Sequence, residues 1–178
     1  MTFCKNPPII VSVLHNYFRG VFFMEKDAHF GPKIKLLSNA FEQTLNQKLA
    51  AQNITSAQSY FLRFLHKKEL RGVSVHSKDI AEAFQLKHST VSGILQRLET
   101  NGFLSFVPDA CDHRLKCIVL SEKAHCGQQM IREAFEHLEE RMLTGFTEEE
   151  AALFYRFLLR ASDNIGAILP PDNEEKGE

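Results

Sequence analysis

The segment 75–101 most constrains how this chain can fold, because it holds two helix-length patterns joined by a short polar break. The first pattern starts at Ser77, a residue type that caps free backbone N–H groups at a helix start. Its apolar residues follow at the spacing of one helical face: Ile80, Ala81 and Phe84. The second begins near His88, and its apolar residues recur every three or four positions: Val91, Ile94, Leu95 and Leu98. The segment therefore predicts a helix-turn-helix.

The second predicted helix, 88–100, has a small and polar outward face. With its apolar residues inward, the opposite face and its flanks carry Ser89, Thr90, Ser92, Gly93, Gln96 and Arg97. A stability-driven surface helix usually carries Glu and Lys pairs and avoids Gly, which costs about 1 kcal/mol relative to Ala. A helix that enters the DNA major groove needs short side chains, hydroxyls and amides instead. The face is typical of DNA recognition, and an ordinary helical hairpin in a bundle is the alternative.

From Gly102 the hydrophobic period changes from helical to alternating, which predicts a β-hairpin. We expect one strand in 103–108, a polar tip in 109–113 and a second strand in 114–120. A recognition helix followed directly by a hairpin is the winged-helix arrangement, in which the hairpin tip reaches along the duplex. The hairpin therefore favours DNA recognition for the preceding segment.

Two stretches, LKHSTVSGILQRLETNGF and PDACDHRLKCIVLSEKA, resemble the MarR family of bacterial transcription regulators. The resemblance covers about 30–168, and its most specific part is the Asp-x-Arg wing pattern, formed here by Asp112 and Arg114. It implies a dimer in which the wing Arg enters the minor groove and the neighbouring Asp orients it. This chain has Gly93 where many members have Arg, and His113 replaces a frequent Arg at the tip.

The predicted DNA-contacting residues lie on the second helix, just before it and on the wing. They are Lys87, His88, Ser89, Thr90, Ser92, Gly93, Gln96, Arg97, His113, Arg114 and Lys116. Asp112 is expected to orient the wing. The 21 basic and 22 acidic residues nearly balance, so the whole chain has no general attraction to nucleic acid. Binding must then depend on local placement, with a modest electrostatic contribution from each subunit.

Further helices are expected on both sides of the DNA-binding lobe, 55–120. One spans 30–51, with Pro32 in its first turn and an apolar stripe from Ile34 to Leu49. Two more lie in 121–168, where Ser121 can cap the first and Thr147 forms a capping box with Glu150. These helices carry more apolar surface than a small lobe can cover, which indicates a homodimer interface, with a self-contained monomeric bundle as the alternative.

Within the lobe, Thr55 and Gln58 predict a capped helix that ends near Lys68. Residues 73–75 predict a short strand that pairs with the wing. The expected fold is therefore mainly α with a small β-hairpin wing (α+β). It is a winged helix-turn-helix with N- and C-terminal dimerisation helices.

One domain is expected, over 30–169, with segments of different character on either side. Residues 1–29 are interpreted as an N-terminal extension. Its residues up to Phe23 are either the product of a translation-start error or loosely attached, and a short helix packed on the dimer is the alternative. Residues 170–178 are polar, begin with two prolines and predict a disordered tail. No apolar run approaches the roughly 18–20 residues that span a bilayer, and no signal-peptide pattern is present. We expect a cytoplasmic protein without a membrane partner.

Catalysis, cofactors and metal binding are not expected from the sequence. The histidines fall on different predicted elements, without a His-Glu-x-x-His helix, and the four cysteines lack paired ligand spacing. Cys117 and Cys126 are interpreted as ordinary small apolar residues on a strand and a helix. A separate hypothesis concerns Cys111, a wing-tip thiol near His113 and Arg114, whose oxidation would alter the DNA-contacting tip.

The sequence thus predicts a homodimeric repressor that reads a pseudo-palindromic operator in double-stranded DNA through helix 88–100 and wing 104–120. The family resemblance implies a small-molecule effector that changes the spacing of the two recognition helices. The alternative function is a winged-helix module for protein contacts, such as an adaptor or antirepressor, without specific DNA binding.

Overall fold

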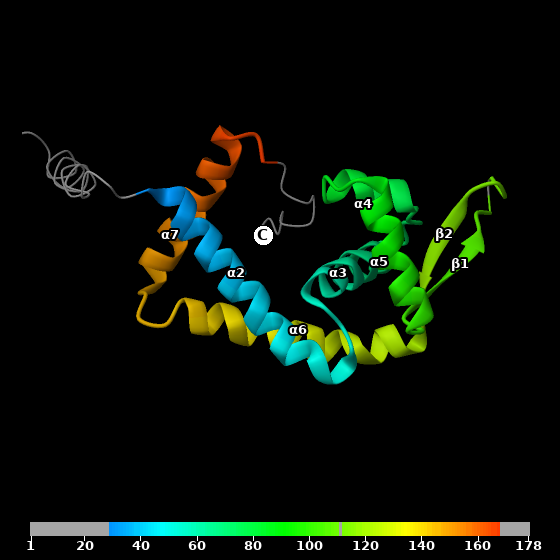
Figure 1. The fold of residues 1–178 in the computed structure, drawn as a ribbon, viewed down its shortest axis with the longest axis horizontal. Coiled ribbons are helices and arrows are strands. Elements are labelled where there is room, and N and C mark those ends of the chain that lie inside the picture. Colours follow the sequence, from blue (N-terminus) through cyan, green and yellow to red (C-terminus); the bar gives the residue numbers. More distant parts are fainter. Residues whose placement is uncertain (1–28, 111, 168–178) are drawn as a thin grey trace, which may run out of the picture. The chain divides into compact units, whose positions relative to one another are not determined.

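The computed structural model describes residues 29–110 and 112–167. In chain order its elements are α2 (Phe30–Leu49), η1 (Ala50–Gln52), α3 (Ser56–Leu70), α4 (Ser77–Ala83), α5 (His88–Thr100), β1 (Leu104–Pro108), β2 (Lys116–Leu120), α6 (Glu122–Met142) and α7 (Glu148–Asn164). The two strands form one antiparallel sheet (Figure 1). The expected mainly helical fold with a small hairpin is therefore confirmed. The predicted tail, Cys111 and all but His29 of the predicted extension lie outside the described residues.

The chain divides between Ala40 and Phe41 into two compact units. The first half of α2 belongs to the first unit, and every residue of that half is exposed. Its exposed large apolar side chains are Phe30, Ile34, Leu36 and Leu37. In the second unit, Leu45 and Leu49 of the same helix are fully buried. The predicted apolar stripe of α2 is therefore covered only toward its C-terminal end.

Helix α3 begins with the predicted capping box. Thr55 Oγ1 accepts the backbone N–H of Gln58 at 3.3 Å, and Gln58 Oε1 accepts the backbone N–H of Thr55 at 2.9 Å. Two backbone donors that the helix itself cannot satisfy are thus paired. The helix then buries Phe61 and Leu62 almost completely and packs on both α5 and α6, which makes it the centre of the core.

Helices α4 and α5 form the predicted helix-turn-helix, with one correction at the first cap. The cap residue of α4 is His76 rather than Ser77, because the backbone is still extended at His76 and enters the helix only at Ser77. The His76 N–H donates to Asp79 Oδ2 at 2.7 Å, which satisfies the entering backbone. The turn after α4 passes through Gln85, whose φ of 51° is left-handed and sends the chain sharply into α5.

The inward face of α5 packs as its hydrophobic period predicts. Val91, Leu95 and Leu98 are at most 1% exposed. Behind the turn, the ring of Phe84 packs against Phe61 at 5.0 Å between centroids, which joins α4 to the α3 core. Helix α5 is therefore held from one side only, and its opposite face is exposed.

The hairpin pairs Leu104 with Leu120 at its base and Pro108 with Lys116 at its outer end. Its second strand begins at Lys116, later than expected, because the tip folds back through turns up to Leu115. The strand predicted at 73–75 is wrong. A backbone hydrogen bond of 2.9 Å from Ile118 N–H to the Val75 carbonyl takes its place, since the chain leaves at once to begin α4.

Helix α6 is capped by Ser121 as predicted, with Ser121 Oγ accepting the Ala124 N–H at 3.3 Å. It ends at Met142, and Gly145, whose φ of 88° is left-handed, lies in the turn that follows. Helix α7 starts with the predicted Thr147 capping box but has no buried residue. Among residues 29–110 and 112–167, no helix is both long enough and apolar enough to cross a membrane.

Candidate nucleic-acid interface

The outward face of α5 has the composition that the sequence predicts, and it is open to solvent. The exposed residues of the predicted set on and before this helix are Lys87, His88, Ser89, Thr90, Ser92, Gln96 and Arg97. Gly93 is half-buried, and a Cβ placed there would meet no other atom within 4 Å. The side chains of His88 and Ser92 lie 3.3 Å apart, between Nδ1 and Oγ. The face is thus shallow at its middle and lined by hydroxyl, amide and imidazole groups.

The C-terminal end of α5 is fastened to the start of α6. Lys123 Nζ donates to the Asn101 carbonyl at 2.7 Å and lies 4.3 Å from the centre of the Phe103 ring. Ser121 Oγ donates to the Gly102 carbonyl at 2.7 Å. A cation at the carbonyl end of a helix is favourable, because the helix dipole is negative there. These contacts hold the orientation of α5 against the helix that follows the wing.

At the wing tip, Asp112 holds Arg114 in one conformation. Arg114 Nε donates to Asp112 Oδ1 at 3.1 Å, and Arg114 Nη2 donates to Asp112 Oδ2 at 3.2 Å. The Arg114 backbone N–H also donates to Asp112 Oδ1 at 3.1 Å. These hydrogen bonds from Arg114 lower the pKa of the Asp112 carboxyl. Arg114 is nevertheless 91% exposed, so its side chain is both fixed and accessible.

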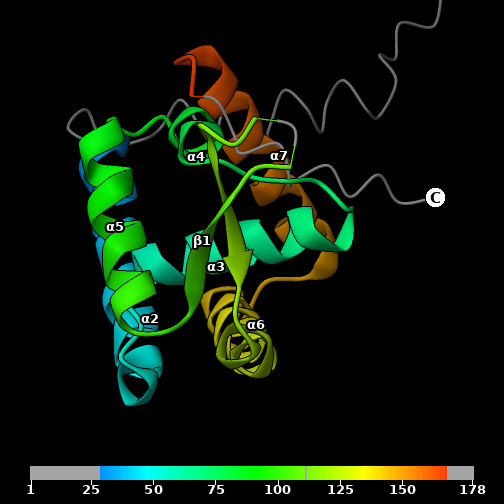
Figure 2. The ribbon, with the colours of Figure 1, turned by 90° about the vertical axis from the view of Figure 1, so that its right-hand side faces the viewer.

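The rest of the tip carries two further basic side chains and is held by hydrogen bonds to Asp109. His113 and Lys116 are exposed, as expected for the predicted contacts. Asp109 Oδ1 accepts the backbone N–H of Asp112 at 3.1 Å, and the Asp109 N–H donates to the Leu115 carbonyl at 3.0 Å. The loop that carries Arg114 is therefore tied to Asp109, the first residue after β1. Strand β1 contacts α5, so the wing and the exposed helix belong to one lobe (Figure 2).

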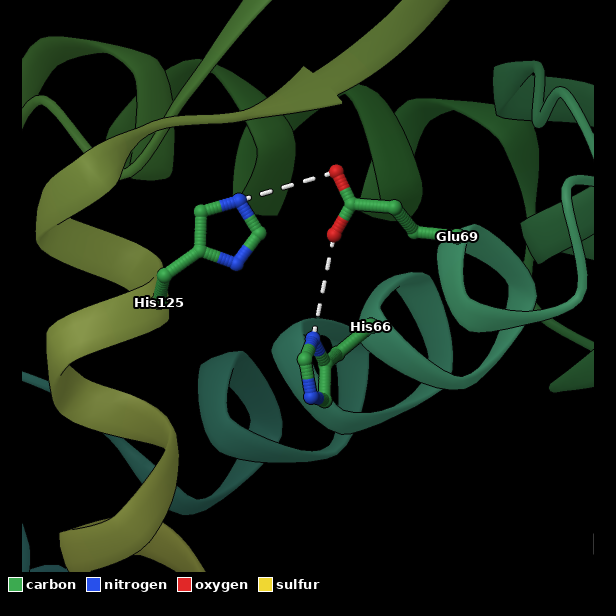
Figure 3. A group of neighbouring side chains, drawn as sticks. All are labelled: His66, Glu69 and His125. Atoms are coloured by element: carbon green, nitrogen blue, oxygen red, sulfur yellow. Dashed lines mark ion pairs between the residues drawn. The ribbon is translucent and has the colours of Figure 1, made fainter.

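The structure brings two histidine-containing groups of potential metal ligands together, and sequence spacing does not predict either group. His66 and Glu69 of α3 meet His125 of α6, with imidazole N to carboxylate O distances of 3.7 and 3.6 Å (Figure 3). His76 meets two residues of the wing, Asp109 and Cys117. The only signal for either group is the residue types themselves, because their partners lie far apart along the chain.

The two described cysteines also differ from the expected small apolar residues. Cys117 is buried, but its Sγ donates to Asp109 Oδ2 at 2.8 Å, and this hydrogen bond raises the pKa of the thiol. Cys126 is exposed on α6, with its Sγ 3.8 Å from Glu122 Oε1. The strand position correctly predicted burial of Cys117, whereas the polar partner depends on how the wing tip folds.

Comparisons with known proteins agree with this geometry. Residues 52–115 match the model of the MarR family. The chain is 24% identical over 133 residues to an uncharacterized HTH-type transcriptional regulator, YybA, of Bacillus subtilis (strain 168), which covers 75% of this chain and 86% of that protein.

Solved structures share the fold. A Staphylococcus aureus MepR–DNA complex superposes with a TM-score of 0.71 at 24% identity and covers 79% of this chain and 99% of that one. A structure of MarR gives a TM-score of 0.67 at 22% identity, covering 80% of this chain and 95% of that one. The family model takes in α3, α4, α5, β1 and the wing tip as far as Leu115. Residues 52–115 thus match the MarR family model, and the chain shares the winged-helix fold of these solved structures, which makes it similar to regulators of that family.

Proposed function

We propose that this chain is a transcription regulator that binds double-stranded DNA, with α5 in the major groove and the wing beside it. One observation carries the proposal: an exposed, polar helix face lies in the same lobe as an arginine that is held ready by Asp112. Residues 88–97 contain no carboxylate, so this face does not repel phosphates. The N-terminus of α5 adds a partial positive charge that favours phosphate contact.

Each exposed group has a suitable role on a duplex. Gln96 can form paired hydrogen bonds to adenine, and the hydroxyls of Ser89, Thr90 and Ser92 can meet base edges or phosphates. Lys87, His88, Arg97, His113 and Lys116 are placed to contact the backbone. Gly93 allows the helix to approach the groove floor closely, and Arg114 enters the minor groove. The fold likeness to the Staphylococcus aureus MepR–DNA complex supports this mode of binding.

We infer that the regulator is a homodimer. Helix α7 has no buried residue, although it carries the exposed apolar side chains Tyr155, Phe157 and Leu158. The first half of α2 exposes apolar residues as well. Exposed apolar surface of this kind usually marks an interface, so a second copy of the chain is expected to cover both helices. A dimer would place two α5 helices on the two halves of a pseudo-palindromic operator.

The finer functional assignment follows from the family. We infer a cytoplasmic repressor whose DNA affinity changes when a small molecule binds and favours another spacing of the two recognition helices. The competing function is an adaptor or antirepressor that uses the winged helix for protein contacts. The net charge of −1 favours this competitor to the extent that it weakens general attraction to DNA.

A salt titration with a duplex from the chain's own promoter region separates the two functions. For a DNA-binding regulator, log Kd changes linearly with log salt, and Arg114→Ala lowers the slope by about 1 per subunit because one phosphate-region contact is lost. Arg132→Ala is the matched control, since it removes an exposed arginine of α6 outside the predicted set. Absent or salt-insensitive binding would support the adaptor. Selection from random DNA would then define operator symmetry and half-site spacing.

A further inference from the structure

Three potential metal-ligand atoms from separate parts of the chain converge at the root of the wing. His76 Nε2 comes from the cap residue of α4, Asp109 Oδ2 from the residue that follows β1, and Cys117 Sγ from β2. The N to O distance is 3.1 Å, the S to O distance is 2.8 Å and the S to N distance is 3.4 Å. The three atoms therefore form a compact triangle of nitrogen, oxygen and sulfur.

The triangle has nearly the size of one face of a tetrahedral zinc site. Zinc bonds of about 2.0–2.3 Å to N, O and S place neighbouring ligand atoms roughly 3.3–3.5 Å apart. Two edges are already within a few tenths of an ångström of that range. The third is the S–H to carboxylate hydrogen bond, and it would lengthen by less than about 1 Å once a cation replaced the proton. His76 and Asp109 are 19% and 13% exposed, so the site is sheltered yet reachable.

A second carboxylate supports the histidine from behind. Asp79 Oδ2 lies 3.3 Å from His76 Nδ1 and also accepts the His76 backbone N–H at 2.7 Å. Metal-binding histidines usually donate their other ring N–H to a carboxylate or carbonyl, which orients the ring and makes the ligating nitrogen more basic. When Nδ1 donates to Asp79, the Nε2 lone pair faces Asp109 Oδ2 and Cys117 Sγ. The one proton among these three atoms is then the thiol proton, which Cys117 donates to Asp109. A cation would satisfy all three groups together.

We propose that His76, Asp109 and Cys117 bind a divalent transition-metal ion of the zinc class, with water as the fourth ligand. The mixed imidazole, carboxylate and thiolate set suits zinc or cobalt better than magnesium or calcium, which prefer oxygen ligands. On binding, the Cys117 thiol releases its proton to solvent, and Asp109 Oδ2 exchanges the S–H hydrogen bond for a metal bond. No electron transfer is involved.

The position of the site connects metal binding to the proposed DNA function. Asp109 would bind the ion through Oδ2, while its Oδ1 accepts the backbone N–H of Asp112 at 3.1 Å. Asp112 in turn holds Arg114. A metal ion would therefore fix the wing root and, through it, the arginine. This step rests on the proposed function, and we expect the metal-loaded protein to bind its operator about 2- to 10-fold more tightly, because an ordered wing loses less freedom on binding.

The His66, Glu69 and His125 group provides an internal control. Its carboxylate lies between the two imidazoles, with one oxygen toward each, and the three side chains are 30–41% exposed (Figure 3). The contact between Glu69 and His125 joins α3 to α6, whereas the contact between His66 and Glu69 lies within α3. The group contains no thiol, so metal binding there would persist in Cys117→Ser and would be lost in His125→Ala.

The direct test is titration of the metal-free, reduced full-length protein with Co²⁺, followed by displacement with Zn²⁺. We expect one equivalent per subunit with a thiolate-to-cobalt charge-transfer band. The band should disappear in Cys117→Ser and weaken in Asp109→Asn, but persist in Cys126→Ser and His125→Ala. Absence of the band in the unmodified protein, or its persistence in Cys117→Ser, would overturn the site. Neither outcome can result from poor folding of a variant.

The DNA arm compares operator affinity of the unmodified protein and Cys117→Ser with and without Zn²⁺. We expect zinc to tighten binding only in the unmodified protein. Equal affinities with and without bound zinc would overturn the link between the site and the wing but leave the site intact. If no DNA binds under any condition, the proposed function fails, whereas the cobalt spectrum still decides the metal site.

Discussion

Removing the side chain of Asp112 should change DNA affinity in opposite directions through its two roles, orienting Arg114 and repelling phosphates. Asp112 is an acidic group in the proposed DNA-contacting tip, so by charge alone its removal should strengthen binding. Its carboxylate also accepts two hydrogen bonds from the Arg114 guanidinium and one from the Arg114 backbone. If fixing Arg114 matters more than repelling phosphates, Asp112→Ala should weaken DNA binding.

The size of the effect follows from the freedom that Arg114 would regain. Immobilising a long side chain at an interface costs about 0.5–1.5 kcal/mol, and two wings in a dimer double that cost. The corresponding loss of affinity is about 5- to 150-fold in Kd. The opposing charge effect is screened, because the Debye length is about 10 Å at 0.1 M salt. We therefore expect a net loss, which becomes clearer as salt is raised.

The assay is operator binding measured by fluorescence anisotropy for Asp112→Ala, Arg114→Ala and the double variant. In the double variant the effect of Asp112→Ala should vanish or reverse, because no arginine remains to be oriented. The unfolding midpoint should stay unchanged, since Arg114 is almost fully exposed and surface pairs contribute little to stability. Tighter binding by Asp112→Ala at all salt concentrations would refute the orienting role.

Three further predictions address the core, the dimer and the pH dependence of stability. Leu98→Ala should lower the free energy of unfolding by about 2–5 kcal/mol, because Leu98 is fully buried on the inward face of α5. A denaturant curve that matches that of the unmodified protein would contradict this packing. Phe157→Glu should convert the inferred dimer into a folded monomer, as measured by sedimentation. A dimer that persists would argue against α7 as part of the interface. Burial raises the pKa of Tyr60, so its neutral form is favoured in the folded state. The neutral Tyr60 therefore adds to the free energy of unfolding below the ordinary tyrosine pKa of about 10, and this contribution is lost as pH rises through the raised pKa of the folded state. In Tyr60→Phe this alkaline loss should be absent from unfolding curves measured across pH.

Local patterns along the chain were sufficient to predict the elements that carry the proposed DNA contacts. Helix α5 occupies the predicted residues 88–100 because its apolar positions leave one face to pack and one to expose. The capping boxes at Thr55 and Thr147 form as expected because both partners lie within one helical turn. These features depend on short-range spacing, which sequence periodicity reports directly.

Features that depend on distant partners were not predictable in the same way. The Val73–Val75 segment has β-branched residues, yet it forms no strand and is joined to the wing by a backbone hydrogen bond from Ile118 and a side-chain hydrogen bond between Ser74 and Cys117, because α4 begins immediately afterwards. The cluster at the wing root requires that β2 present Cys117 toward Asp109 and that the chain before α4 bring His76 to the same place. That result depends on hairpin register and on the packing of the lobe, and neither can be predicted from the spacing of residues along the sequence.

The two parts of the proposed DNA interface are positioned by separate sets of contacts. The C-terminal end of α5 is fastened to α6 through Lys123 and Ser121, whereas the wing tip is fastened to the start of α4 through Asp109 and His76. A ligand that shifts α6 would therefore act first on α5, the proposed major-groove helix. A metal ion bound at the wing root would act first on Arg114, the proposed minor-groove contact. Because each route ends on a different DNA contact, two signals could adjust affinity separately within one small lobe.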